Sequence, residues 1–329
     1  MDTPEADIAV DAQLVARLIQ AQHPDLTGPL RLVANGWDNA LFRLGDTLCV
    51  RIPRRSVAAG LALNEQRWLP EFARRVSVPI PVPVRIGLPS DLYPWPWSIC
   101  PWFDGIPASD ASASDRAALA DDLAEFITQL HTPAPEGVAP FNRVRGVPLP
   151  TRSPAVLDRL KSGAIPHSTE LRALWNMLSA APAWIGPTLW LHGDLHPANL
   201  LLDDNLPHRA ATRQHSYAAQ PAQPAQPERG GRPLRAVLDF GDLTAGDPAT
   251  DLAAAWLVFD EEGRAAFRAG LAERAGGSQF ALASLGDDTW ARARGWALSM
   301  ATAMAAHSDD NPRMAAVGAH AIEQVLLGG

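Results

Sequence analysis

The stretch that decides the fold of this chain is HGDLHPAN, at residues 192–199. It lies between two short apolar runs, TLWL at 188–191 and LLL at 200–202. We expect both runs to be buried strands, and a polar loop held between buried strands presents its side chains in fixed positions. The loop offers the carboxylate of Asp194 and, five residues later, the amide of Asn199.

A third apolar run, AVL at 236–238, ends in the tripeptide DFG, so Asp239 also lies at the edge of a predicted strand. One carboxylate can orient a hydroxyl group and accept its proton. An amide and a second carboxylate suit a hard cation such as Mg²⁺, which takes oxygen ligands. An Asp and an Asn in one loop, followed by Asp-Phe-Gly, is the arrangement of kinase-type phosphoryl transfer.

Length and composition narrow the class of protein. The chain has 329 residues, enough for two lobes, and a net charge of −8 with no basic stripe of the kind that binds nucleic acid. No apolar run is long enough to span a membrane, and the N-terminus lacks an apolar signal segment, so we expect a cytoplasmic protein without a membrane partner. Cys49 and Cys100, the only cysteines, are expected to be buried free thiols.

The first hundred residues predict a small lobe built on an antiparallel sheet. The expected elements are a helix at 10–22, strands at 30–33, 40–44 and 47–52, a helix at 57–76, and strands at 84–86 and 97–100. Pro70 is expected to break or restart the second helix, because proline lacks an N–H and clashes with the preceding turn. The boundary of the lobe is predicted as a hinge at residues 101–105.

Residues 106–329 predict a mostly helical second lobe. The expected helices are 114–130, 154–162, 168–181, 249–258, 262–275, 289–306 and 313–327. An insertion at about 204–233 interrupts the strand pair that carries Asn199 and Asp239. It contains QPAQPAQP at 220–227, a composition that cannot bury enough apolar surface to fold, and we expect it to be disordered.

Residues 192–199 and 237–253 together resemble the signature of the aminoglycoside phosphotransferase family, a branch of the protein-kinase-like fold. The resemblance extends from about residue 30 to the last helices. It implies a two-lobed α+β fold, with a small antiparallel-sheet lobe followed by a mostly helical lobe. The spacer from Asn199 to Asp239 is longer than the family's usual tight hairpin, because it holds the insertion.

The resemblance also implies roles for individual residues. Asp194 matches the catalytic base that orients the substrate hydroxyl, while Asn199 and Asp239 match the magnesium ligands. Asp251 matches an acidic position near the start of the next helix, where its expected role is to hold the catalytic loop through backbone N–H groups or His192.

Arg51 occupies the place of the family's phosphate-binding lysine, and Glu65 the place of its ion-pair partner. Arginine keeps the positive charge and can grip phosphate with two N–H groups, but it is longer and planar. We therefore expect the pair to anchor the α- and β-phosphates of ATP, or alternatively of GTP. The competing interpretation is an exposed surface ion pair, since such pairs are common and weak.

Two further segments are placed near the nucleotide by the resemblance. The loop from Gly36 to Asn39 lies where such proteins cover the phosphates, and its backbone N–H groups could cradle phosphate oxygens. In the hinge, the Pro101 carbonyl and the Phe103 N–H are placed to pair with adenine.

Aminoglycosides are polycations, so a site for them needs carboxylates. The candidates are Asp242, Asp247, Asp260, Glu261 and Glu262. Asp242 directly follows DFG and is expected near the active site. The run at 260–262 has another interpretation, the acidic first turn of a helix, which the helix dipole favours.

These observations together predict an enzyme that moves the γ-phosphate of ATP to a hydroxyl group of a small molecule, with an aminoglycoside-like antibiotic as the first choice of acceptor. A macrolide, a sugar or an amino alcohol is the alternative acceptor. A nucleotide-binding pseudokinase is the alternative of another class: Arg51 favours it, whereas the intact Asp194, Asn199 and Asp239 oppose it. The oligomeric state is left open by the sequence.

Overall fold

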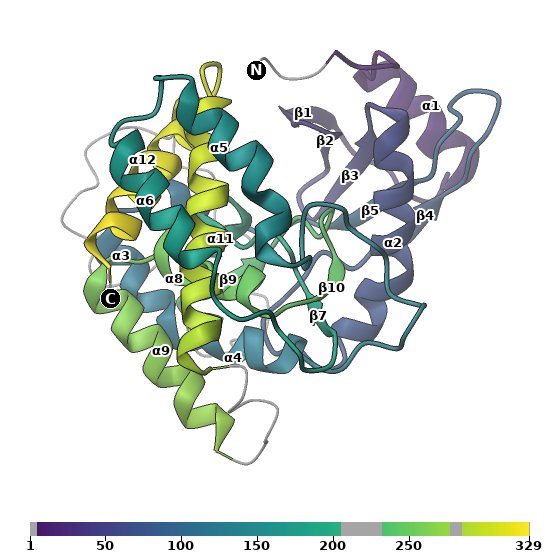
Figure 1. Ribbon diagram of the computed structural model, residues 1–329. Helices are drawn as coiled ribbons and strands as arrows, with labels where there is room; N and C mark the ends of the chain where they lie inside the picture. Colours follow the sequence, from purple (N-terminus) through teal and green to yellow (C-terminus); the bar gives the residue numbers. More distant parts are fainter. Residues whose placement is uncertain (1–4, 205–231, 277–284, 329) are drawn as a thin grey trace.

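The computed structural model describes residues 5–204, 232–276 and 285–328. A lobe built on a β-sheet is followed by a larger lobe of helices, as Figure 1 shows with the sheet at the upper right. The segment at 205–231 lies outside the described residues, so the disorder of the insertion stays a prediction.

The first lobe contains a five-stranded antiparallel sheet in the order β1-β2-β3-β5-β4. Its strands are β1 (Leu30–Asn35), β2 (Asn39–Leu44), β3 (Leu48–Pro53), β4 (Arg85–Gly87) and β5 (Trp97–Pro101). Alternate residues of β2 are buried, which is the two-residue period of a half-buried strand. The buried side of the sheet packs against α1 (Ala12–Gln22), whose apolar stripe contributes Val15, Leu18 and Ile19 to one hydrophobic cluster.

The second helix, α2 (Ser56–Phe72), connects the two lobes. Its C-terminal half belongs to the large core of the helical lobe, where Trp68 lies 4.6 Å from Trp190 between ring centroids. The predicted break at Pro70 is wrong, because the helix continues through this residue. Pro70 lies in the last turn, so the helix ends two residues later instead of being divided.

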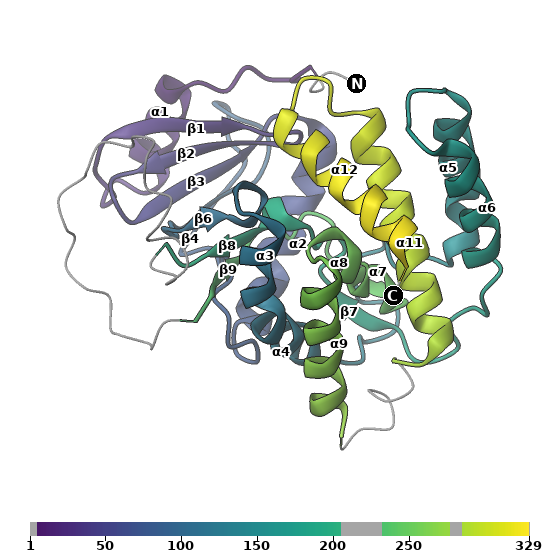
Figure 2. The same ribbon diagram turned by 90° about the vertical axis from the view of Figure 1, so that its left-hand side faces the viewer.

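The second lobe is organised around one long buried helix, α11 (Asp287–Ala306). Figures 1 and 2 show α11 between the pair α5 and α6 on one side and α12 on the other, and α11 contacts all three. The other helices of this lobe are α3 (Ala113–Arg116), α4 (Ala120–Leu130), α5 (Ser153–Lys161), α6 (Ser168–Leu178), α7 (Ala249–Leu252), α8 (Ala254–Leu257), α9 (Glu261–Ala275) and α12 (Pro312–Leu327). None of the helices in the described ranges has the length and apolar character that a membrane span requires.

Two small sheets hold the polar loop. The strand β7 (Leu189–Leu191) pairs with β10 (Thr244–Gly246), and β8 (Leu200–Leu202) pairs with both β6 (Ile106–Pro107) and β9 (Leu234–Val237). In the β8–β9 pair, Leu200 lies opposite Val237. The Leu238 N–H also donates to the carbonyl oxygen of Asn199 at 2.8 Å. Backbone pairing therefore brings the DFG tripeptide beside the end of the 192–199 loop.

Candidate active site

One buried carboxylate, that of Asp251, binds the backbone of the loop at 192–199. Asp251, in α7, is 0% exposed and accepts hydrogen bonds from the backbone N–H groups of His192 and Gly193, both at 2.8 Å. His131, at the end of α4, contacts the same carboxylate through Nε2 at 3.1 Å. The expected contact between Asp251 and the backbone N–H groups of the loop is confirmed, whereas His131 was not predicted from the sequence.

Gly193 is required by the backbone of this loop. Its φ of +87° lies in the left-handed region, which side chains with a Cβ rarely adopt. A Cβ at this position would also collide with the carbonyl oxygen of Asp242. The close approach of the loop to the residue after DFG therefore depends on glycine.

His192 joins the loop to DFG through both ring nitrogens. Its Nε2 donates to the carbonyl oxygen of Leu238 at 2.9 Å, and its Nδ1 accepts from the backbone N–H of Asp194 at 3.2 Å. The ring also lies 4.5 Å from the ring of Phe240 between centroids. These contacts fix one tautomer and one orientation of the His192 ring, and they connect the 192–199 loop to the DFG tripeptide.

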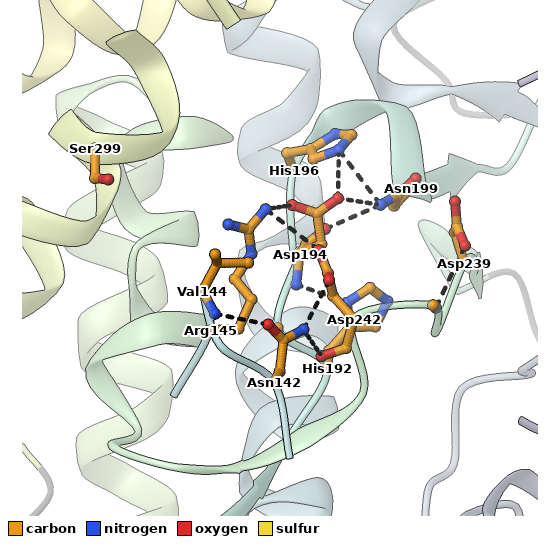
Figure 3. A network of polar contacts seen from close by, with 12 residues as sticks. Asn142, Val144, Arg145, His192, Asp194, His196, Asn199, Asp239, Asp242 and Ser299 are labelled. Atoms are coloured by element: carbon orange, nitrogen blue, oxygen red, sulfur yellow. Dashed lines mark hydrogen bonds and ion pairs between the residues drawn. The ribbon is translucent and has the colours of Figure 1, made fainter. Parts of the chain in front are cut away.

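The carboxylate of Asp194 lies at the centre of a polar network (Figure 3). One carboxylate oxygen accepts from Arg145 at 2.8 Å and the other lies 3.2 Å from Nε2 of His196. Burial would raise the pKa of Asp194, but His196 and Arg145 outweigh it and hold that pKa well below its usual range. Asp194 is therefore ionised at neutral pH.

Arg145 is a site residue that the sequence did not reveal. Its guanidinium also contacts Asp242 at 3.3 Å, so one cation is shared by two carboxylates. Asp242 accepts a further hydrogen bond from the amide of Asn142 at 2.8 Å. Burial raises the pKa of Asp242 even though Arg145 opposes the shift. Arg145 and Asn142 belong to the connection between α4 and α5, which has no periodic pattern in the sequence.

Asn199 and Asp239 lie at the edge of the network where DFG meets the 192–199 loop. The Asn199 amide nitrogen donates to the backbone carbonyl of Asp194 at 2.9 Å, which orients the side chain and leaves its amide oxygen without a partner among the described residues. Asp239 has a φ of +58°, an unusual conformation for a residue other than glycine, and its side chain is 55% exposed. Both side chains offer oxygen atoms of the type that Mg²⁺ binds.

The predicted ion pair between Arg51 and Glu65 is present, with a separation of 3.1 Å. The alternative of an exposed surface pair is wrong, because the two side chains are only 13% and 7% exposed. Arg51 also contacts Asp239 at 3.1 Å, and Glu65 accepts from the Phe240 N–H at 3.1 Å. Burial raises the pKa of Glu65 to about 7, although Arg51 lowers it. The pair thus connects β3 and α2 to DFG.

The structure places the other predicted nucleotide residues less directly. The Gly36 N–H donates within its own loop to the Asn39 carbonyl at 2.9 Å. Gly36 lines a cavity between the two lobes, whereas Asn39 does not. Pro101 pairs with Leu48 at the end of β5, and neither it nor Phe103 belongs to the lining of that cavity. The roles of these four residues stay predictions.

A cavity of about 480 Å³ lies between the two lobes. Its lining includes Asp194, Asp239 and Asp242 on one side and residues of α11 and α12 on the other. Figure 3 shows Ser299 of α11 set apart from the polar network. The cavity therefore has a polar half at the 192–199 loop and a second half formed by helices.

Four of the five acidic residues considered for substrate binding lie outside the lining of this cavity: Asp247, Asp260, Glu261 and Glu262. Asp260 is the N-cap of α9 and accepts from the Gly263 N–H at 2.9 Å, and Glu261 lies in the first turn of the same helix. The interpretation of this run as a helix start therefore describes it. Asp247 is buried in an ion pair with Arg292 at 2.7 Å. Of the acidic candidates, Asp242 remains at the site.

Residues 29–210 and 228–296 match the model of the phosphotransferase enzyme family, which amounts to more than half of the chain. The chain belongs to the phosphotransferase enzyme family. This result confirms the resemblance drawn from residues 192–199 and 237–253. The match is interrupted at 211–227, inside the predicted insertion of this phosphotransferase.

Solved structures of other phosphotransferases have a similar fold. The GDP complex of an aminoglycoside 2'-phosphotransferase-IIIa mutant is 20% identical with a TM-score of 0.64, and the alignment covers 96% of this chain and 97% of that chain. The streptomycin–ATP ternary complex of APH(2")-IIa is 16% identical with a TM-score of 0.53, with coverage of 94% and 95%. The macrolide 2'-phosphotransferase apoenzyme from Brachybacterium faecium is 22% identical with a TM-score of 0.53, with coverage of 94% and 98%.

These likenesses confirm the predicted two-lobed α+β fold of the phosphotransferase. No curated protein sequence matches the chain significantly.

Proposed function

We propose that this phosphotransferase moves the γ-phosphate of ATP to a hydroxyl group of a small molecule, with Asp194 as the residue that orients the hydroxyl. The observation that supports this proposal is that Asp194 and Asp239 line one cavity, that the Asn199 amide is bonded to the Asp194 carbonyl beside them, and that Asp251 binds the backbone of the same loop. Complexes of similar fold contain ATP or GDP, and ATP is our first choice of donor.

The chemistry follows from the state of Asp194. The substrate hydroxyl donates to the ionised carboxylate, which aims the oxygen at the γ-phosphorus. As the new P–O bond forms, the bond to the β–γ bridging oxygen breaks and ADP leaves with that electron pair. The hydroxyl proton passes to Asp194. A carboxylate with a low pKa is a weak base, so this transfer comes late, which suits a loose transition state in which positioning dominates.

Asn199 and Asp239 fit the cation that such a reaction uses. The amide oxygen of Asn199 has no partner among the described residues, and the carboxylate of Asp239 is more than half exposed. The described residues contain no group of three His, Cys, Asp or Glu side chains that could hold a metal ion. Two protein ligands, with phosphate oxygens and water completing the shell, is the usual way in which Mg²⁺ is held at a nucleotide. When bound, Mg²⁺ neutralises charge that develops on the phosphates.

Arg51 supplies a positive charge beside Asp239, the proposed cation ligand. Glu65 holds its guanidinium beside Asp239, where the non-transferred phosphates of ATP would meet the cation ligands. An arginine offers two N–H groups to a phosphate, so its planar group can replace the ammonium of a lysine. A pseudokinase is disfavoured because the chain keeps Asp194, Asn199 and Asp239, and backbone pairing brings DFG beside the 192–199 loop.

The test is an assay of ADP release from Mg²⁺-ATP with purified protein, across aminoglycosides, macrolides, sugars and amino alcohols. Asp194→Asn should lower turnover of any accepted substrate by about 10³-fold, because the amide cannot accept the proton. Binding of Mg²⁺-ATP, measured by calorimetry, should change by less than about threefold, since Asp194 faces the acceptor. Asp158→Asn, on the exposed side of α5, is the matched control.

Loss of nucleotide binding with retained turnover would contradict the role given to Asp194. Tight nucleotide binding by the unmodified protein, with no turnover of any acceptor, would favour the pseudokinase.

A further inference from the structure

The half of the cavity formed by helices is lined by one guanidinium, by three methionines and by polar residues such as His307 and Asp310. Arg152 comes from the turn that begins α5, and Met300, Met304 and Met314 come from α11 and α12. Methionine side chains are apolar and adaptable, so this wall suits a hydrophobic part of a ligand. The position of this wall, across the cavity from Asp194, is where an acceptor would lie.

Arg152 has no hydrogen-bond or ion-pair partner within residues 5–204, 232–276 and 285–328. It is partly buried, and its Nε is fully buried without a hydrogen bond. Burial lowers the pKa of Arg152, and the neighbouring positive charge of Arg145 lowers it further. A partly buried cation with no counter-charge is unfavourable, because it loses water without gaining a partner. An anion at this position would supply that partner.

The neighbouring arginines are differently placed. Arg145 is neutralised by Asp194 and Asp242. Arg159 lies behind this wall and donates to neutral groups, the Ser299 carbonyl at 2.9 Å and the Thr302 hydroxyl, so it brings no negative charge to Arg152. Of these three guanidinium groups, only that of Arg152 lines the cavity without a bonding partner.

The carboxylates of the lining are not available to a polycation. Each has a partner already: Asp38 with Arg55 at 3.5 Å, Asp194 and Asp242 with Arg145, and Asp239 with Arg51, while Asp310 is not free either. A ligand with several ammonium groups would have to displace these arginines, whereas an anionic ligand would not.

We propose that the acceptor of this phosphotransferase carries an anionic group, a carboxylate or a phosphate ester, which binds Arg152. Its apolar part packs against Met300, Met304 and Met314, and its hydroxyl reaches Asp194. This inference rests on the proposed function and replaces the polycationic acceptor expected from the sequence with an anionic one.

The probes are matched compounds that differ only in charge: ω-hydroxyalkanoates and ω-hydroxyalkyl phosphates of medium chain length, the diols and the ω-amino alcohols. Each is measured for binding by calorimetry in the presence of a non-hydrolysable ATP analogue, and for ADP release with ATP. We expect an anionic probe to bind at least about tenfold more tightly than its diol, the ratio that one charged hydrogen bond supplies. The two kinds of anion distinguish a carboxylate from a phosphate as the group recognised.

Arg152→Gln should remove this preference and Arg152→Lys should keep part of it, while the affinity for the diol and for the ATP analogue stays unchanged. Arg172→Gln, an exposed arginine of α6, is the matched control and should leave the preference intact. The inference is wrong if no anionic probe binds more tightly than its diol, or if Arg152→Gln weakens nucleotide binding as much as probe binding. Absence of nucleotide binding by the unmodified protein would instead contradict the proposed function itself.

Discussion

Arg145 forms an ion pair with Asp194 at 2.8 Å, and the same guanidinium contacts Asp242 at 3.3 Å. Two carboxylates on neighbouring loops are thus held together by one positive charge, which keeps them from repelling each other. The pair also fixes the direction in which Asp194 presents its oxygens. Arg145 is therefore a positioning residue for the proposed reaction. Its ion pairs are with Asp194 and Asp242, and not with the proposed metal ligands Asn199 and Asp239.

Replacing Arg145 by glutamine should damage both stability and activity. The change leaves two close carboxylates without a cation, so we expect a loss of about 3 kcal/mol in the free energy of unfolding. It should also raise the pKa of Asp194, so that the acid limb of the pH–rate profile moves upward. Denaturant unfolding and the pH dependence of ADP release measure the two effects. Arg145→Lys should recover part of each; equal loss in both variants, with an unmoved pH profile, would indicate a packing role alone.

Replacing Asp251 should lower both the stability of the fold and the turnover, because this carboxylate sets the conformation of the 192–199 loop. Asp251→Asn replaces one acceptor oxygen by an amide that cannot accept from His192 or Gly193, and leaves a buried N–H unpaired. We expect a loss of roughly 2–4 kcal/mol in unfolding free energy, together with a large fall in turnover. Thermal and urea unfolding provide the measurement. Unchanged stability would show that the loop keeps its conformation without this carboxylate. Asp158→Asn again serves as the control.

The pKa of Glu65 predicts a pH dependence near neutrality. Since the buried carboxyl has a pKa of about 7 and its ordinary value is 4.5, it is fully ionised only above pH 7. Its hold on Arg51 should weaken as pH falls through 7, and activity should fall with it, at most tenfold per pH unit for a single titrating group. Stability changes in the opposite sense: the native state keeps the proton longer than the unfolded chain, so this group makes the protein less stable as pH rises from about 4.5 to 7.

Glu65→Gln should therefore lower activity at high pH and remove the limb near pH 7. The same variant should lack the decline in unfolding free energy between pH 4.5 and 7 that Glu65 causes. If the limb near pH 7 persists in Glu65→Gln, another group titrates there. Glu71→Gln, on the exposed end of α2, is the matched control.

Deleting residues 214–229 should leave the site intact. The strand pair β8–β9 and the hydrogen bond from Leu238 to Asn199 align Asn199 and Asp239, the two proposed metal ligands, on either side of this segment. Shortening the connection by roughly half changes loop closure by only about 0.6 kcal/mol. We expect the melting temperature to move by a few degrees at most, measured by calorimetry, with ADP release unchanged. A collapse of the melting temperature would show that the segment contributes to the fold.

Local patterns in the sequence predicted the loop and the strands around it, because period, turn chemistry and strand ends are set by neighbouring residues. The pairing of Arg51 with Glu65 was predicted by the family resemblance. Arg145 and His131 could not be found in this way. Each meets its partner across long stretches of chain, and each lies in or beside a connection with no regular structure, where only the finished fold brings the groups together.

The acidic run at 260–262 shows the converse limit. A carboxylate that caps a helix and one that binds a cationic ligand look alike in a sequence, and only the position relative to the cavity separates them. The sequence did not mark Arg152 as unusual either, since an arginine without a partner is recognised only after all its neighbours are known.

The contact between Arg51 and Asp239 has a consequence for how nucleotide affinity is set. The arginine neutralises the same carboxylate that is proposed to hold the metal ion. Loading the cleft with Mg²⁺-ATP is then a swap of counter-ions: the carboxylate exchanges a guanidinium for a divalent cation, and the guanidinium exchanges a carboxylate for a phosphate. Affinity is then governed by the difference between two sets of ion pairs, and a residue at position 51 that binds Asp239 more weakly, but phosphate equally well, would make the nucleotide bind more tightly.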